Sequence, residues 1–295
     1  MSEKRALTEK YRRALPLSCA AAALGLSRKC LDEKETTEDD AGVWKQRIEA
    51  ILLETPCYGY RKVTAALRRL GHVVNHKKVM RIMRETGLKQ KRRKYKPRTT
   101  DSRHRLRTFP NMVKDIIPAF PHHVWASDIT YVRLPRGFCY VAIIIDVFTK
   151  RIVGWAIALS MELPLVMEAL ERALTKGVPH FHHSDRGGQY CATEYVGTLE
   201  KLGVKVSMAD TGVSVDNPFA ESFNRTLKVE EVYLHEYQAL DDARASIEDF
   251  IERVYHTKRL HQSLGYLTPE EFSTAWELQN KSRVLPFTHY KMLDK

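Results

Sequence analysis

The chain contains few cysteines, and none of them is placed to cross-link it. Five cysteines are scattered along the 295 residues, and no two of them form a Cys-X-X-Cys pair. Disulfide frameworks use an even number of spaced cysteines, and zinc knuckles use such close pairs. The sequence therefore indicates neither, and this use of cysteine is typical of a protein in the reducing cytoplasm.

Long hydrophobic runs are also missing. No uninterrupted apolar stretch approaches the roughly 20 residues that a helix needs to cross a bilayer, so no membrane partner is expected. The segment ALPLSCAAAALGLS (14–27) follows basic residues and imitates the apolar region of a signal peptide. It contains Ser18 and Cys19 and lacks a small-residue cleavage site, which makes export the weaker interpretation. We expect an amphipathic helix there instead.

Acidic residues are scarce in the first part of the chain, which is strongly basic. Residues 1–86 hold 18 Lys and Arg against 11 Asp and Glu, and residues 87–107 hold ten against one. Residues 108–295 hold 20 against 24, so the net charge of +12 comes from the front of the chain. Basic blocks usually bind the phosphate backbone of nucleic acid. The alternative is a solvated basic linker, and a linker that orders on DNA would combine both.

Short amphipathic helices are predicted within the basic front, at 44–54, 61–70 and 76–86. Gly71 ends the second of them, and Asn75 is a favoured cap for the third, which carries basic residues around its apolar stripe. Two helices around a glycine-containing turn are typical of a helix-turn-helix, whose second helix enters the major groove of DNA. Many helix pairs are simple packing units, but the basic face favours DNA binding.

From about residue 119, the residue pattern changes to one typical of β-strands. Three β-rich runs, at 123–134, 138–149 and 151–160, are separated by short turns, which predicts an antiparallel meander. Helical and β-rich segments alternate after them, in the order βββαβαβα, and two helices follow at 218–233 and 241–256. This order predicts an α/β fold with a mixed five-stranded sheet flanked by helices.

Three acidic residues occupy informative places in this outline. Asp128 stands inside the first β-rich run, where an unpaired charge is costly to bury. Asp185 follows the fourth strand, and Glu221 lies on the helix that begins at residue 218. Three carboxylates without a set of histidines or cysteines are typical of a Mg²⁺ or Mn²⁺ site. Two such ions about 4 Å apart would support phosphodiester displacement.

Four stretches carry a resemblance to a known family. In chain order they are WASDITYV (125–132), HSDRGGQY (183–190), DNPFAESFNRTLKVE (216–230) and YHTKRLHQSLGYLTPEEF (255–272). They resemble the integrase-core signatures of insertion-sequence DDE transposases, especially the second-frame (orfB-type) products of two-frame elements. The 35 residues between Asp185 and Glu221 match the DD35E spacing of that group. Residues 43–95 also resemble its helix-turn-helix region.

The resemblance covers about residues 43–272 and implies both a fold and a reaction. It implies an RNase H-like core in which Asp128, Asp185 and Glu221 are catalytic and hold two Mg²⁺ ions, with Mn²⁺ as a substitute. The implied reaction is cleavage at insertion-element ends by water, followed by in-line attack of the 3′-hydroxyl on another phosphodiester.

The family also implies partners and a location. The expected partners are double-stranded DNA (element terminal inverted repeats and target DNA) and further copies of the chain. A fusion or partnership with a first-frame (orfA) product is a further expectation. The expected location is the bacterial cytoplasm, in association with the nucleoid.

The expected organisation has five parts. They are an N-terminal helical segment (1–42), a helix-turn-helix DNA-binding domain (43–88), a basic linker (89–118), the RNase H-like integrase catalytic core (119–275) and a C-terminal tail (276–295).

Basic and polar residues are expected to hold the DNA. Arg225 and Lys228 follow Glu221 by one and two turns on the same helix face, where they can grip phosphates beside the metal ions. An ordinary solvated helix face is the alternative for this pair. The other candidate DNA contacts are Asn217, Asn224, Tyr60, Arg61, Lys77, Lys78, Arg81, Arg84, Arg92, Arg93 and Lys94.

Several residues near the carboxylates are expected to have structural roles. Turn or capping roles are predicted for Asp146, Asp210 and Asp216, and hydrogen-bonded strand positions for His182 and His183. Arg186 either steers phosphate or pairs with an acid. The chain departs from the family pattern at Gly188, His256 and Leu260, where Ser, Asn and Pro are frequent.

Two other functions remain as alternatives. A catalytically silent DNA-binding regulator would use the helix-turn-helix while the core only dimerises, and the intact acidic triad argues against it. A tyrosine recombinase is suggested by HTKR (256–259), with Tyr290 lying 31 residues after Arg259. That function leaves the β-rich core and the triad unexplained.

Overall fold

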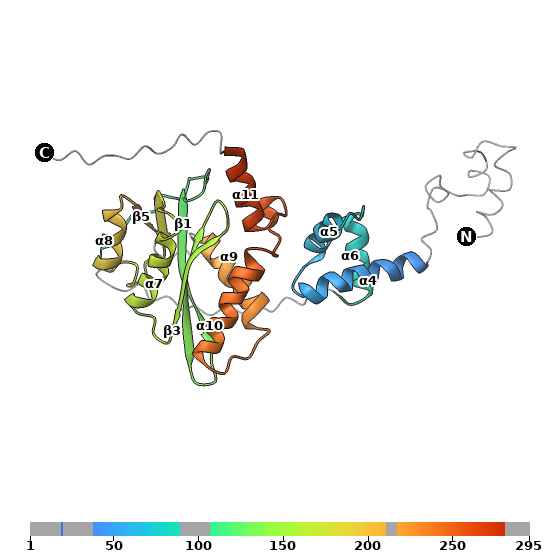
Figure 1. Cartoon of the computed structure of the whole chain (residues 1–295), viewed down its shortest axis with the longest axis horizontal. Coiled ribbons are helices and arrows are strands. Elements are labelled where there is room, and N and C mark those ends of the chain that lie inside the picture. Colours follow the sequence, from blue (N-terminus) through green and yellow to red (C-terminus); the bar gives the residue numbers. More distant parts are fainter. Residues whose placement is uncertain (1–18, 20–37, 89–106, 211–216, 281–295) are drawn as a thin grey trace.

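The structure is a computed structural model that describes residue 19 and residues 38–88, 107–210 and 217–280. It consists of a small helical unit and a larger unit built on a sheet (Figure 1). Some predictions fall outside the described residues. These concern most of the N-terminal segment and of the C-terminal tail, most of the basic linker with Arg92, Arg93 and Lys94, and the residues Asp216 and Tyr290.

The helical unit has three helices whose ends follow local signals. α4 spans Glu38–Glu54, α5 spans Tyr60–Arg69 and α6 spans His76–Glu85. Gly71 has a φ of +84°, a left-handed conformation that suits glycine, and it ends the turn after α5. The Asn75 side chain accepts a hydrogen bond from the Lys77 amide at 2.9 Å and caps α6. The expected helix pair is confirmed.

Five strands form one mixed sheet in the order β3-β2-β1-β4-β5. Their bounds are Val124–Arg133 (β1), Phe138–Asp146 (β2), Ile152–Ala158 (β3), Phe181–Ser184 (β4) and Lys205–Met208 (β5). The first three strands pair antiparallel, as the meander predicts, whereas β4 pairs parallel with β1 and β5 parallel with β4. This order and pairing are those of an RNase H-like sheet, so the predicted fold class is confirmed.

Helices cover both faces of the sheet. α7 (Leu163–Leu174) and α8 (Thr193–Lys201) make the parallel crossovers and pack on one face, while α9 (Pro218–Leu227) and α10 (Leu240–Asp249) pack on the other (Figure 1). A Cβ on Gly154 would lie 2.1 Å from the carbonyl oxygen of Ala169, so glycine is required where α7 approaches β3.

The two helices predicted at 218–233 and 241–256 change geometry near their ends. α9 continues as a π-helical turn, η1 (Lys228–Val232), and α10 continues as another, η2 (Phe250–Tyr255). Glu231 in η1 is buried and accepts a hydrogen bond from Tyr237 Oη at 3.1 Å. A short 3-10 turn, η3 (Gln262–Leu264), and α11 (Pro269–Asn280) complete the described chain.

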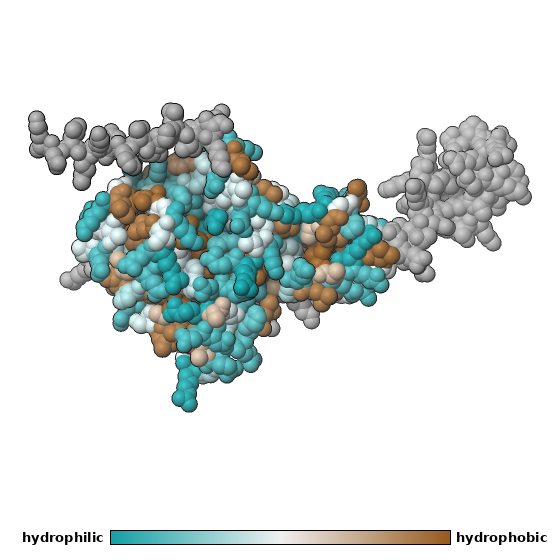
Figure 2. Space-filling view, viewed as in Figure 1, coloured by the Kyte–Doolittle hydropathy of each residue, from teal (hydrophilic) through white to brown (hydrophobic). Residues whose placement is uncertain are grey.

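The surface of both units is mainly hydrophilic on the face that Figure 2 shows, with apolar residues in separate small groups. Most of the large apolar side chains of the described residues are buried on the two faces of the sheet and inside the helical unit. Within the described ranges, no helix combines the length and the apolar character needed to span a membrane.

Candidate active site at the edge of the sheet

Asp128 lies on β1 with both carboxylate oxygens hydrogen-bonded. Oδ1 accepts from the Ile129 amide at 2.9 Å, and Oδ2 accepts from Asn224 Nδ2 at 2.8 Å. Burial, the charge of Asp185 and, to a smaller extent, the charge of Glu221 together raise the pKa of this carboxyl to about 7. The two hydrogen bonds oppose this rise because they stabilise the ionised form.

Asp185 stands just beyond β4, where the sheet register brings it to Asp128. Ala126 pairs with His183, so continuing the parallel register by two residues sets Asp128 against Asp185. The Gly187 amide donates to Asp185 Oδ1 at 2.9 Å, which makes a tight turn. A Cβ on Gly187 would lie 3.0 Å from that oxygen, so the small residue keeps the turn open. The aspartate thus shapes its turn and faces a second carboxylate.

Glu221 lies in the first turn of α9 and is exposed. Partial burial raises its pKa, and the charge of Arg225 opposes the rise. Two asparagines fix α9 against β1, because Asn217 Nδ2 donates to the Ser127 carbonyl at 2.7 Å and Asn224 donates to Asp128. The helix that carries the third acid is therefore held directly beside the first one.

Asp128, Asp185 and Glu221 are not arranged in this structure as a complete set of metal ligands. Among the described residues, no three His, Cys, Asp or Glu side chains are grouped so that they could hold a metal ion. The chemistry of the donors nevertheless fits a hard cation, since all three are carboxylates. The side-chain oxygens of Asn217 and Asn224 are also buried, with no hydrogen-bond partner in the described part of the chain.

Two basic residues follow Glu221 along the same helix. Lys228 Nζ lies 4.1 Å from the centre of the Tyr131 ring, a cation–π distance, and burial lowers its pKa while the charge of Asp128 raises it. Arg225 is exposed and acts electrostatically on Glu221. Both cations therefore border the carboxylates, and the sequence contained no signal for the contact of Lys228 with Tyr131.

The neighbouring histidines and acids have structural partners. His182 Nε2 is 2.9 Å from Tyr195 Oη, and burial lowers the pKa of this histidine to about 3, which keeps it neutral. His183 Nδ1 lies 3.0 Å from Ser207 Oγ. Asp146 is buried and accepts hydrogen bonds from the backbone amides of residues 122, 148 and 149, as expected of a turn residue.

Arg186 pairs with an acid in this structure. Its Nε donates to the Ala209 carbonyl at 2.7 Å, and its Nη2 lies 3.6 Å from Asp210 Oδ1. These contacts tie the turn after β4 to the end of β5, which supports the position of Asp185.

The candidate DNA contacts of the helical unit lie mostly on its surface. Lys77, Arg81 and Arg84 on α6 are exposed, as is Arg61 on α5. Lys78 is half-buried, with Nζ 4.9 Å from the centre of the Trp44 ring. The ring of Tyr60 stacks on His76, with 6.3 Å between ring centres. The outward face of α6 is therefore basic.

An RNase H-like sheet with one carboxylate on β1 and another just beyond β4 defines the polynucleotidyl transferase class. Comparison with known families agrees with this class. Two profiles described as Integrase core domain match residues 118–214 and 202–269, and a profile described as HTH-like domain matches residues 38–96.

Curated relatives identify the family. The transposase for insertion sequence element IS904 of Lactococcus lactis is 33% identical over 235 residues, which cover 78% of this chain and 93% of that protein. Transposase InsF for insertion sequence IS3A of Escherichia coli is 34% identical over 220 residues, covering 73% and 76%. The chain belongs to the family of insertion-sequence transposases with an integrase core.

Solved structures of integrases are also similar in outline. The catalytic core domain of the HTLV-2 integrase, solved with magnesium, is 15% identical with a TM-score of 0.42 and covers 52% of this chain and 97% of that one. The simian T-cell lymphotropic virus intasome is 16% identical with a TM-score of 0.45 and covers 84% and 80%.

Proposed function

We propose that the chain cuts DNA at the ends of an insertion element and joins the freed 3′-hydroxyl to a second phosphodiester. The observation that carries the proposal is the position of Asp128 against Asp185 across neighbouring strands, with Glu221 on the helix that Asn217 and Asn224 fix beside them. The charge of Asp185 raises the pKa of Asp128, so the two carboxylates repel each other when both are ionised and the site favours cations. This charge pattern suits phosphodiester chemistry.

Asp128, Asp185 and Glu221 would hold two Mg²⁺ ions, or Mn²⁺ in their place. Bound there, the ions would lower the pKa of water and offset charge on the leaving oxygen. The protein's own part is orientation. Asn224 fixes one oxygen of Asp128, and the Gly187 amide fixes one oxygen of Asp185.

Lys228 and Arg225 would bind the phosphates next to the reacting one. They stand on the α9–η1 side of the carboxylates, so a strand held by them would present its phosphodiester to the three acids. The scissile strand would then need no covalent bond to the protein, because in-line displacement depends on positioning and charge.

The helical unit would bind the duplex near the element end. Its exposed basic residues on α6, Lys77, Arg81 and Arg84, would lie along the major groove and its phosphates. Cutting two ends and joining them to a target requires more than one active site, so we expect a homo-oligomer on DNA. A first-frame product is the further partner that we expect.

The test is cleavage of a plasmid that carries the DNA ends flanking the coding sequence of this chain. Wild-type protein should nick the ends with Mg²⁺ or Mn²⁺ and not with EDTA, and Asp185→Asn should abolish nicking while DNA binding persists. Asp115→Asn is the matched control, since Asp115 is an exposed acid outside β1, β4 and α9. Equal cleavage by wild type and Asp185→Asn would refute the role of the carboxylates. DNA binding without cutting, even after the first-frame product is added, would support a regulator.

A further inference from the structure

The stretch 255–272 contacts the helical unit rather than the three carboxylates. Leu260 is buried in the hydrophobic core of the helical unit, among residues that include Ile48 and Leu67. The Leu260 amide donates to Tyr58 Oη at 2.8 Å, and that hydroxyl donates to the Lys258 carbonyl at 3.3 Å. A segment of the sheet-containing unit therefore completes the core of the other unit.

Charged contacts surround this apolar one. Arg259 donates to both carboxylate oxygens of Glu230, at 2.8 and 2.9 Å, and the two side chains are only 13% and 15% exposed. Lys62 Nζ on α5 lies 3.9 Å from the same glutamate. At the far end of α5, Arg69 forms a two-pronged ion pair with Glu271. Such buried and bidentate pairs hold the units in one relative orientation.

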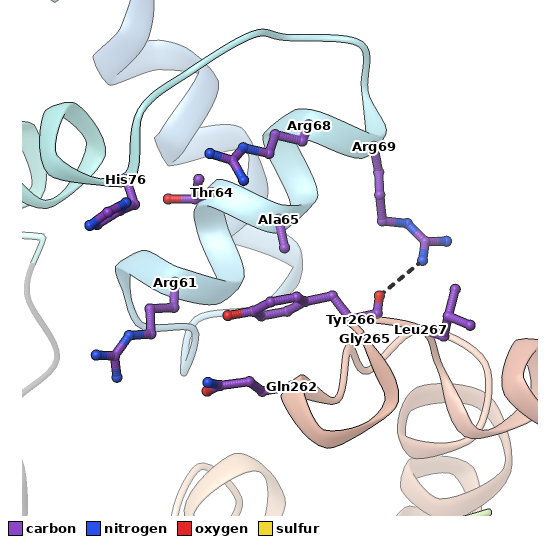
Figure 3. Close-up of a pocket in the computed structure, with 10 residues that line it drawn as sticks. All are labelled: Arg61, Thr64, Ala65, Arg68, Arg69, His76, Gln262, Gly265, Tyr266 and Leu267. Atoms are coloured by element: carbon purple, nitrogen blue, oxygen red, sulfur yellow. Dashed lines mark hydrogen bonds between the residues drawn. The ribbon is translucent and has the colours of Figure 1, made fainter.

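An open cavity of about 430 Å³ lies between α5 and the turn that follows η3. Arg61, Arg68 and His76 line it from the helical unit, and Gln262, Tyr266 and Leu267 line it from the other unit (Figure 3). None of its lining residues is acidic.

The polar groups of this cavity point to an anion. In Figure 3, the Tyr266 hydroxyl is directed toward Arg61, and the Gln262 amide lies on the same side. Arg61 and Gln262 are exposed. Within the described residues, no acid pairs with Arg61, and no hydrogen bond engages the Gln262 amide or the Tyr266 hydroxyl. Three donors therefore converge in a basic, open cavity.

The turn that presents Tyr266 is held in an unusual conformation. Gly265 and Tyr266 both have left-handed backbones, with φ of +66° and +64°. A left-handed conformation is rare for a bulky residue and is found most often at functional positions. The amides of Tyr266 and His261 fix it by hydrogen bonds to the carbonyls of His261 (2.8 Å) and Leu267 (3.0 Å).

We propose that this cavity binds a backbone phosphate of duplex DNA, with Arg61 supplying the charge and Gln262 and Tyr266 donating hydrogen bonds. The proposal rests on the proposed function, since it assumes a DNA duplex on the helical unit. It gives the stretch 255–272 a role in DNA binding in addition to packing. Through this stretch the sheet-containing unit binds the same duplex as the helical unit, which fixes the distance between the DNA end and the carboxylates.

The experiment measures binding of a fluorescein-labelled DNA duplex, about three helical turns long, by fluorescence anisotropy across a range of salt concentrations. Arg61→Gln should weaken binding about three- to tenfold and lower the salt slope by about 0.9, because one phosphate contact is lost. Gln262→Ala and Tyr266→Phe should weaken binding about two- to fivefold with the salt slope unchanged, because these donors carry no charge. Arg253→Gln is the control, a cation on η2 that is 80% exposed and outside the cavity.

The outcomes separate the possibilities. Equal loss for a duplex of arbitrary sequence and for one carrying the element end supports a phosphate contact, and a loss confined to the end duplex overturns it. If only Arg61→Gln weakens binding, the shared cavity is overturned and the helical unit binds alone. If every variant binds like wild type, the cavity is overturned while the proposed function stands. If wild type binds no duplex at all, both fail. Unchanged thermal unfolding of the variants shows that they are folded.

Discussion

Replacement of Asp128 by Asn should stabilise the metal-free protein at alkaline pH. The carboxyl group of Asp128 has a pKa raised from 3.8 to about 7 by burial and by the charges of Asp185 and Glu221. Asn keeps an oxygen that can accept from the Ile129 amide, as Asp128 does now at 2.9 Å. Its amide can donate to Asn224 if that side chain turns over, and the Asn224 oxygen is buried without a described partner.

The size of the effect follows from the two pKa values. The folded protein holds a proton on Asp128 between about pH 4 and pH 7, whereas the unfolded chain does not. The free energy of unfolding therefore falls as pH rises through this window, and the loss is complete above about pH 7. Three pKa units correspond to an upper bound of about 4 kcal/mol. Solvent reaches this half-buried side chain, so we expect about 2 kcal/mol, or roughly 5 °C in Tm.

The assay is thermal unfolding of wild type and Asp128→Asn in EDTA, at about pH 5 and about pH 8. The variant should be the more stable protein at the higher pH, and the difference should shrink at the lower pH. Adding Mg²⁺ at the higher pH should raise the Tm of wild type more than that of the variant. Asp115→Asn, at an exposed position outside β1, β4 and α9, is the control, and its Tm should follow that of wild type at both pH values. A variant that is less stable than wild type at about pH 8, or a Tm difference that is the same at both pH values, would refute the reasoning.

Three further predictions concern stability. Leu260→Ala should lower the free energy of unfolding by about 2–4 kcal/mol, because it leaves a cavity in the core of the helical unit. Chemical denaturation and proteolysis of that unit measure the loss. Resistance equal to that of wild type would contradict the packing of Leu260. Asn75→Ala should lower the free energy of unfolding by about 1 kcal/mol through loss of the α6 cap, whereas Asn75→Gly should lower it by only a few tenths of a kcal/mol. Equal losses for the two variants would argue against a side-chain cap. Glu230→Gln should lower the free energy of unfolding by about 2–4 kcal/mol, since it leaves the buried charge of Arg259 unpaired. Glu49→Gln, which breaks an exposed ion pair, is the control and should change the free energy of unfolding little.

The sequence alone was sufficient wherever the signal was local. Runs of β-branched and aromatic residues predicted the antiparallel meander, and Asn75 and Gly71 predicted the ends of helices, because both signals act over a few residues. The order of elements predicted the mixed sheet, since a crossover helix makes the next strand parallel. Motif spacing alone also selected Asp128, Asp185 and Glu221 as the candidate carboxylates.

The tertiary structure decided which distant residues meet. No local pattern predicts Leu260 inside the helical unit, because about 200 residues separate it from its hydrogen-bond partner Tyr58. His256, which departs from the family pattern, is buried and accepts from the Ile152 amide at 2.9 Å, a contact between a helix end and a strand. Arg186 could have steered phosphate, and only the approach of β5 gave it Asp210.

The same division applies to the carboxylates. The prediction of these three residues came from their type, their places along the chain and the resemblance of their motifs, all of which the sequence carries by itself. The pKa values of Asp128 and Glu221 depend on burial and on neighbouring charges, and the position of α9 depends on its two asparagines. Those quantities are set by distances between elements that are far apart in the chain, so they exist only once the sheet and its helices have packed.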